Sequence, residues 1–256
     1  MTSIKELKST IIKEPHPELW MHTYLNKKSL YITRLLLKTN ITPNQITLYG
    51  ILIGIIGVFL ISFSNSYISI AGYFVVFIYY ITDFCDGQVA RYKNMGSLKG
   101  KYWDYIGHIV IYPIIFFSIG VHLYNQSGNI FGLFIGIFTT LFYLALFINQ
   151  KLYILVAGSK KSQIQEHWEK KGKKTIKAIA IRIHKTIQFQ FYVITYFILA
   201  EVGDYFLGKK GIEINLVFYL LTIYLIVYSL TFLAQIVIFT KRIEKKENLD
   251  KINQNH

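Results

Sequence analysis

Long apolar runs alternate with polar, basic segments along the chain, and this alternation predicts its architecture. A membrane-spanning helix needs about 20 apolar residues, and six runs are long enough. They cover residues 45–64, 67–84, 103–124, 129–155, 187–207 and 214–239. Hydropathy within each run is continuous, whereas the strands of a membrane barrel would alternate. The pattern therefore predicts an all-α integral membrane protein with six transmembrane helices.

The segment before the first run has a mixed character. Residues 1–44 combine aromatic and aliphatic residues with lysines and arginines, which favours an amphipathic helix lying in the membrane interface. A soluble regulatory helix is the alternative, and the order of residues is not that of a cleaved signal peptide. Thr42-Pro43 breaks the chain before the first span, because proline disfavours helix at the preceding residue. We expect an N-terminal segment at 1–44, a six-helix domain at 45–240 and a cytoplasmic tail at 241–256.

The distribution of basic residues tests the number of spans. The chain has 28 Lys and Arg residues against 14 Asp and Glu, a formal net charge of +14, which in a soluble protein would suggest nucleic-acid binding. Placed between the predicted spans, however, alternate segments hold 26 and 2 of the 28 basic residues. The positive-inside rule explains this distribution if both termini are cytoplasmic. We therefore expect a multi-pass protein of the cell membrane with no nucleic-acid partner.

A cluster of ionisable residues lies where the second and third runs approach the cytoplasm. Asp83 and Asp86 are three residues apart. Gly100, Asp104 and His108 follow at intervals of four. Both intervals place side chains on one face of a helix, so two adjacent helices would gather three carboxylates with an imidazole at the edge. Because charges at membrane depth are costly, such a cluster indicates a functional site on the cytoplasmic side.

The residue types in this cluster indicate its chemistry. Clustered carboxylates without a thiolate favour a hard divalent cation, Mg²⁺ or Mn²⁺. Asp83, Asp86 and Asp104 are the predicted metal ligands, and two ions about 4 Å apart would clamp the phosphates of a diphosphate. Arg91 is suited to binding phosphate oxygens in a bidentate fork. His108, with a reference pKa near 6.5, is suited to taking a proton from an attacking hydroxyl.

Other residues that stand out receive simpler interpretations. The single cysteine, Cys85, excludes a disulfide framework within the chain. Glu201 and Asp204, near the outer end of the fifth run, are expected to be interfacial and separate from the Asp cluster. Glycines at four-residue intervals, among them Gly132 and Gly136, predict close helix packing, either within the chain or between two copies.

The spacing of these residues resembles a family signature. The pattern D-x2-D-G-x2-A-R-x8-G-x3-D-x3-D is typical of the CDP-alcohol phosphotransferases, also called CDP-alcohol phosphatidyltransferases. Seven of its eight fixed positions match here: Asp83, Asp86, Gly87, Ala90, Arg91, Gly100 and Asp104. Thr42-Pro43-Asn44 also resembles the Pro-Asn start of the family's first helix, and the resemblance covers roughly residues 40–240.

The resemblance implies an activity, partners and further site residues. Its members transfer a phospho-alcohol (phosphatidyl-type) group from a CDP-linked donor to an alcohol acceptor and release CMP, in phospholipid or related phosphodiester synthesis. It further implies a metal pair on the carboxylates and a homodimer. The residues expected to hold the cytidine diphosphate are Asn44, Asp86, Gly87, Ala90, Arg91 and Gly100. The candidates for binding the acceptor or its phosphate are Lys99, Lys101, Arg182 and Lys185.

One position departs from the signature. His108 stands where the family has its fourth Asp, the proposed base, so one carboxylate ligand of the second metal is missing. Histidine is a poor ligand for Mg²⁺ and a better one for Mn²⁺. We expect a metal-dependent enzyme in which His108 and Asp104 are the catalytic residues.

Two other classes of protein compete with the enzyme. One is an impaired relative that binds CDP-alcohols as a sensor or partner protein. The other is a cation transporter, which is disfavoured because transporter sites lie near the bilayer midplane. Within the enzyme hypothesis at least one substrate is a lipid, and either the donor or the acceptor fills that role.

Overall fold

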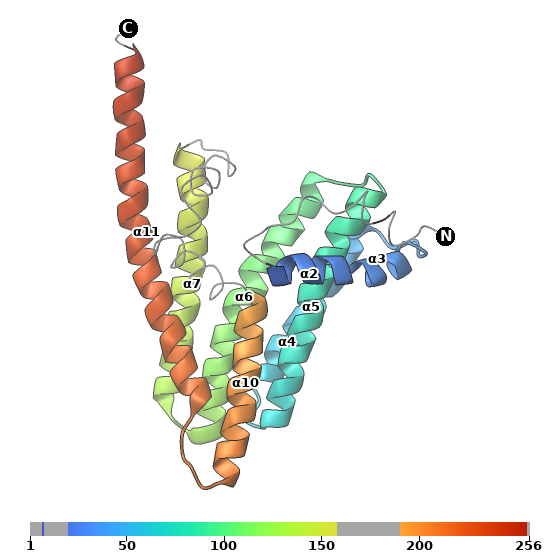
Figure 1. Ribbon diagram of the computed structural model, residues 1–256, viewed down its shortest axis with the longest axis vertical. Coiled ribbons are helices and arrows are strands. Elements are labelled where there is room, and N and C mark those ends of the chain that lie inside the picture. Colours follow the sequence, from blue (N-terminus) through green and yellow to red (C-terminus); the bar gives the residue numbers. More distant parts are fainter. Residues whose placement is uncertain (1–6, 8–19, 158–189, 255–256) are drawn as a thin grey trace.

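The computed structural model describes residue 7 and residues 20–157 and 190–254, and every element in this part of the chain is a helix. Six long helices form one bundle (Figure 1). They are α4 (Pro43–Ile61), α5 (Ser66–Tyr92), α6 (Leu98–Ser127), α7 (Ile130–Ala157), α10 (Gln190–Lys209) and α11 (Leu216–Gln254). The predicted all-α membrane fold is confirmed.

The number of membrane spans is supported for five of the six helices. Within the described residues, all of the long helices except α10 are long and apolar enough to cross a membrane. Helix α10 occupies the fifth predicted run but carries Glu201 and Asp204, so the sixth span stays a prediction. Helix α11 runs without interruption to Gln254, and its apolar part is continuous with the predicted tail.

Within residues 20–42, two short helices precede the bundle. They are α2 (Trp20–Lys28) and α3 (Leu30–Leu36), separated only by Ser29. In Figure 1 they run crosswise to α5, which both of them contact. The sequence predicted a single amphipathic helix here, and a transverse pair is consistent with an interfacial position.

The ends of the first long helices follow from local chemistry. Thr42 caps α4 through a capping box with Gln45, and Pro43 occupies the first turn, where its missing N–H costs nothing. The predicted link at 85–102 is largely helical, since α5 continues to Tyr92 and α6 already begins at Leu98. Polar residues end the apolar run there, but the helix continues because their backbone groups still form helical hydrogen bonds.

Glycines let two pairs of helices touch closely. A Cβ atom on Gly57 of α4 would lie 2.8 Å from the backbone nitrogen of Val76 in α5. A Cβ atom on Gly136 of α7 would lie 2.7 Å from the Cα atom of Gly120 in α6. These glycines pack within the chain, which resolves the alternative that the spacing left open.

An aromatic core joins α6 to the C-terminal helices. The ring of Phe116 in α6 contacts Tyr143 of α7 and Phe197 of α10. It also contacts Tyr224 and Tyr228 of α11. Aromatic pairs in these tilted and edge-on arrangements add to the stabilisation from burial, so this core holds α7, α10 and α11 around α6.

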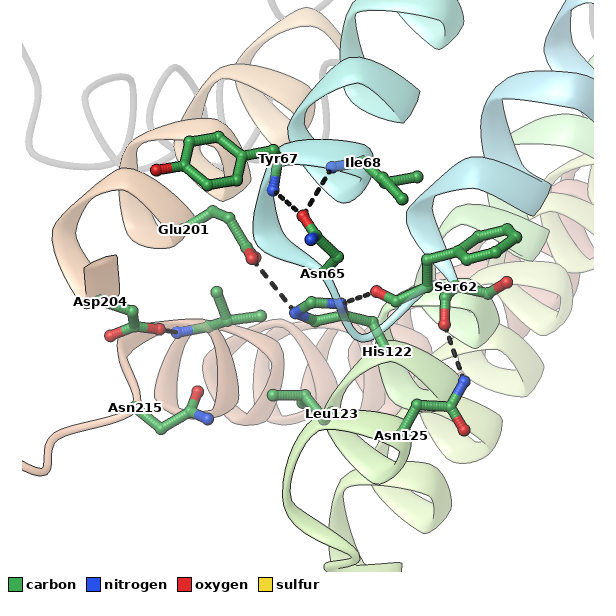
Figure 2. Close-up of polar contacts among 12 residues, drawn as sticks. Ser62, Asn65, Tyr67, Ile68, His122, Leu123, Asn125, Glu201, Asp204 and Asn215 are labelled. Carbon is green, nitrogen blue, oxygen red and sulfur yellow. Dashed lines mark hydrogen bonds and ion pairs between the residues drawn. The ribbon is translucent and has the colours of Figure 1, made fainter. Parts of the chain in front are cut away.

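A buried polar network closes one end of the bundle, here called the far end (Figure 2). His122 of α6 lies 3.2 Å from Glu201 of α10, from Nε2 to Oε1, and each side chain is 1% exposed. The Nδ1 atom of His122 also bonds the backbone oxygen of Phe63. Asp204 accepts the N–H groups of Leu216 and Val217 at the start of α11, at 2.6 and 3.1 Å.

Glu201 was expected at the membrane interface, and the structure shows that its side chain is buried within the bundle. Its carboxylate is withdrawn into the bundle because His122, on another helix, supplies a partner there, and a buried charge needs such a partner. Asp204 caps the next helix, whose first N–H groups have no partner within the helix. Both residues are separate from the Asp cluster, which lies toward the other end of α6.

Candidate functional site

The opposite end of the bundle, here called the motif end, contains the signature residues. Helix α5 carries Asp83 and Asp86, and α6 carries Asp104 and His108. The turn between these helices brings the two stripes face to face. Ser97 caps α6 by accepting the N–H of Gly100 at 2.9 Å, which fixes where the second stripe begins.

Three of the predicted residues form one compact group. His108 lies between two carboxylates, with Nε2 at 3.4 Å from Asp83 Oδ2 and Nδ1 at 3.9 Å from Asp104 Oδ1. One ligand atom from each of the three residues lies within 4.8 Å of the others. The side chains are partly exposed, at 19% for Asp83, 41% for Asp104 and 27% for His108. They are therefore close enough to share a cation and open enough to reach a substrate.

Asp86 has a different environment. It is only 8% exposed and accepts a hydrogen bond from the hydroxyl of Thr47 in α4. It lies outside the group of Asp83, Asp104 and His108, so the structure brings together two of the three predicted carboxylate ligands. The Thr47 bond orients the Asp86 carboxylate toward α4 and ties the first long helix to the motif.

The residues expected to bind the nucleotide lie close to α4. A Cβ atom on Gly100 would lie 2.8 Å from Asn44 Oδ1, so Asn44 sits against the start of α6. A Cβ atom on Gly87 would lie 3.2 Å from a guanidinium nitrogen of Arg91. Arg91 therefore folds back over Gly87, and Ala90 is partly buried beside it. A side chain at either glycine would therefore press on Asn44 or Arg91.

The basic candidates divide into two groups. Lys99 and Lys101 are exposed in the first turns of α6. Arg182 and Lys185 lie outside the described residues. The structure therefore places two of the four candidates near the motif, at the start of the helix that carries Asp104.

A cavity of about 380 Å³ adjoins the carboxylate group. Asp83 and His108 form part of its wall, and its other lining residues come from α2, α5, α6, α7 and α11. Tyr112 stacks on His108, with ring centroids 5.1 Å apart and planes 22° from parallel, which holds the imidazole plane in place. Tyr143 and Tyr228 connect the cavity with the aromatic core.

Sequence reasoning missed several residues of this region. Thr47 ends the segment that resembles the family's entry to the first helix, but the sequence assigned no role to its hydroxyl, which bonds Asp86. Gln88 is fully buried in the motif helix, and His22 lies at the cavity wall. Neither residue belongs to a sequence pattern that predicts its position. Their partners come from distant segments, so only the folded chain reveals them.

The group fits a divalent cation by the chemistry of its donors. Asp83 and Asp104 offer carboxylate oxygens, which suit Mg²⁺ and Mn²⁺, and the imidazole of His108 suits Mn²⁺ better. Glu and Asp clusters that are fully solvated rarely hold an ion, but these carboxylates are partly withdrawn from solvent. Together with the adjoining cavity, the arrangement is suited to chemistry on a phosphate ester.

Comparison with known families identifies a match over most of the chain. The profile of the CDP-alcohol phosphatidyltransferase family matches residues 40–241. A search of curated proteins found no match. The matched range begins just before α4 and includes both helices of the carboxylate group, whereas α2 and α3 precede it.

Proposed function

This chain belongs to the CDP-alcohol phosphatidyltransferase family, and we propose that it is a working enzyme that transfers a phospho-alcohol group from a CDP-linked donor to a second alcohol. The observation that carries the proposal is the group of Asp83, Asp104 and His108, whose ligand atoms lie within 4.8 Å of one another beside a cavity. Family membership makes phosphotransfer from CDP-alcohols the general expectation. The geometry supports a site that still has the groups needed to perform it.

Asp83 and Asp104 would hold a divalent cation, and Asp86 would contribute from its position against α4. When bound, such a cation neutralises charge on the diphosphate and makes its phosphorus a better electrophile. Because His108 replaces a fourth carboxylate, we propose Mn²⁺ as an effective alternative to Mg²⁺ and a weakened second ion site.

His108 is proposed as the general base. Its Nε2 atom lies nearer a carboxylate than Nδ1 does, 3.4 Å against 3.9 Å. Both ring nitrogens thus face carboxylates, which would stabilise the imidazolium that forms when the ring takes up a proton. The imidazole would accept the proton of the acceptor hydroxyl as the acceptor oxygen attacks.

The bond changes balance as follows. The acceptor oxygen forms a bond to the phosphorus that carries the donor's alcohol. The bond from that phosphorus to the bridging oxygen of the diphosphate breaks, and CMP leaves with the electron pair. Asn44, Gly100 and Arg91 are proposed to hold the cytidine diphosphate, since Asn44 of α4 lies against Gly100 and Arg91 folds back over Gly87. Lys99 and Lys101 are proposed to attract a phosphate-bearing substrate.

We further propose that the motif end and both termini are cytoplasmic, because the basic residues concentrate in the segments that meet there. At least one substrate is a lipid, and the protein acts as a homodimer. These proposals rest on charge distribution and on the family resemblance.

The decisive experiment measures CMP release by the purified protein with each divalent cation. CDP-diacylglycerol is offered with glycerol 3-phosphate, serine or inositol, and CDP-ethanolamine is offered with diacylglycerol. We expect metal-dependent release from one pair, loss of release in Asp86→Asn, and a decrease of about 10²-fold or more in His108→Ala.

Two outcomes would change the proposal. Absence of release from every pair, combined with measurable binding of a CDP-alcohol, would favour the sensor or partner protein. Full activity in His108→Ala would remove the base assignment but leave the transferase.

A further inference from the structure

The cavity beside His108 receives a residue from outside the family match. His22 belongs to α2, which precedes residue 40, where the match begins. His22 nevertheless lines the cavity together with Asp83 and His108. Its ring lies edge-on to Phe84, the residue after Asp83, with centroids 4.9 Å apart. The N-terminal helices therefore take part in the walls of the candidate site.

A buried amide holds these helices in place. Gln88 of α5 is fully buried, and its Nε2 atom lies 2.7 Å from the backbone oxygen of Asn26 and 2.8 Å from Ser29 Oγ. Its Oε1 atom accepts the hydroxyl of Thr33 in α3. One side chain of the motif helix thus binds both α2 and α3, and a buried amide that lost these partners would be costly.

The cavity lies on a different side of the carboxylate group from the nucleotide candidates. Its described lining residues include Asp83 and His108, whereas Asn44, Asp86 and Gly100 are not among them. The latter three gather against α4. If the donor's nucleotide lies near α4, the side of His108 that faces the cavity is left for the attacking alcohol.

We propose that His22 contacts the acceptor alcohol and helps to determine which alcohol is used, and that Gln88 is the positioning residue that holds His22 there. This inference rests on the proposed function, because it takes His108 as the base that deprotonates the acceptor. An imidazole can donate a hydrogen bond to an oxygen of the acceptor next to its reacting hydroxyl. The chemical class recognised is an alcohol with a second oxygen close to the one that attacks.

The first test is a kinetic comparison with the substrate pair that supports CMP release by the wild-type protein. His22→Ala should raise the KM for the acceptor about 5- to 10-fold, the loss expected for one hydrogen bond. The KM for the CDP donor should not change. His22→Gln, which still offers an N–H donor, should recover most of the acceptor affinity. Lys27→Ala, an exposed position on the same helix, is the matched control and should behave as wild type.

The second test separates positioning from general damage. Gln88→Leu should raise the KM for the acceptor by a similar factor, because α2 is no longer held. In the His22→Ala background the same change should raise it no further, since contacts that act as a unit are not additive. Multiplied effects in the double variant would show that Gln88 does not act through His22 and would overturn its positioning role.

A labelling measurement does not depend on turnover. His22→Cys is introduced together with Cys85→Ser, which removes the only native cysteine. We expect a methanethiosulfonate reagent to label Cys at position 22, and the saturating acceptor to slow that labelling while CMP alone does not. Protection by CMP and not by the acceptor would overturn the inference.

Failure of this inference is distinguishable from failure of the proposed function. If the wild-type protein releases CMP from no substrate pair, both fall. If the wild-type protein is active but His22→Ala and His22→Gln keep the wild-type acceptor KM, or change only the donor KM, the role of His22 is wrong and the transferase stands.

Discussion

Helix α6 contributes the histidines of two histidine–carboxylate pairs, and the two pairs differ in nearly everything except their chemistry. His108 and Asp83 lie 3.4 Å apart, and His122 and Glu201 lie 3.2 Å apart. The two histidines are about four helical turns from each other, roughly 21 Å along the axis. The first pair is partly exposed beside a cavity, whereas the second is 1% exposed on both sides.

The difference teaches that access decides what such a pair does. At the far end, His122 also bonds the backbone at Phe63, so its ring joins α6 and α10 to the link after α4. Nothing remains there for a substrate to reach. At the motif end, a second carboxylate, Asp104, and a cavity accompany the imidazole. The first pair lies where a substrate can reach it, as the proposed function requires, and the second joins helices within the bundle.

The largest expected effect is a loss of turnover when the charge of Asp83 is removed from the partly exposed pair of Asp83 and His108. Asp83→Asn keeps the shape of the side chain but removes a ligand charge and the partner of the His108 imidazolium. We expect CMP release to fall by about 10²- to 10³-fold, measured at saturating substrate with Mg²⁺ and with Mn²⁺. Stability in detergent should be close to that of the wild type. A loss of folding with normal specific activity would contradict the comparison.

Changes in the buried pair of His122 and Glu201 should lower stability and leave turnover unchanged. Glu201→Ala leaves His122 buried without its partner, and breaking a buried pair costs about 3 kcal/mol of folding free energy. Unfolding in detergent by a chemical denaturant measures this loss. The folded fraction should release CMP at the wild-type rate, because the pair lies far from the cavity.

Glu213→Gln is the control for the far end. Glu213 is exposed in the link before α11, so its replacement should change neither stability nor rate. A large loss of turnover in the folded fraction of Glu201→Ala would show that the two ends are coupled.

The smallest expected effect concerns the choice of metal. His108→Asp restores the fourth carboxylate of the family signature at the accessible pair. The ratio of the rate with Mg²⁺ to the rate with Mn²⁺ should rise about tenfold. Replacing an imidazole by a carboxylate ligand favours Mg²⁺, and changes close to a metal alter its affinity by about this factor. Titration of each ion at fixed substrate provides the measurement. An unchanged ratio would mean that residue 108 does not face the metal.

The success of sequence reasoning differed between the two pairs for a physical reason. Asp83 and His108 belong to stripes with helical spacing on neighbouring helices joined by a short turn, so local periodicity predicts that they meet. His122 and Glu201 lie on helices that are not consecutive. No local pattern records which face of α10 meets α6, and Glu201 was therefore expected at the interface.

The same limit explains the other differences. The motif helices extend beyond the predicted spans because hydropathy reports contact with lipid, whereas a helix ends where its backbone hydrogen bonds end. The interval between Gly132 and Gly136 indicated close packing, but the spacing does not identify the partner helix. Asp86 shares its helix with Asp83, yet the hydroxyl of Thr47 on α4 gives it a separate environment.

By itself, the sequence determined the helical membrane architecture and the position of the carboxylate stripes, because both depend on periodicity and on the energy of placing each residue in lipid or water. Only the tertiary structure decided which residues share a site. It placed His22 at the cavity wall, gave Asp86 a bond to Thr47 of α4, and buried His122 against Glu201. Such contacts join segments that are distant in the chain, and their energies depend on burial and on distances that exist only after the helices have packed.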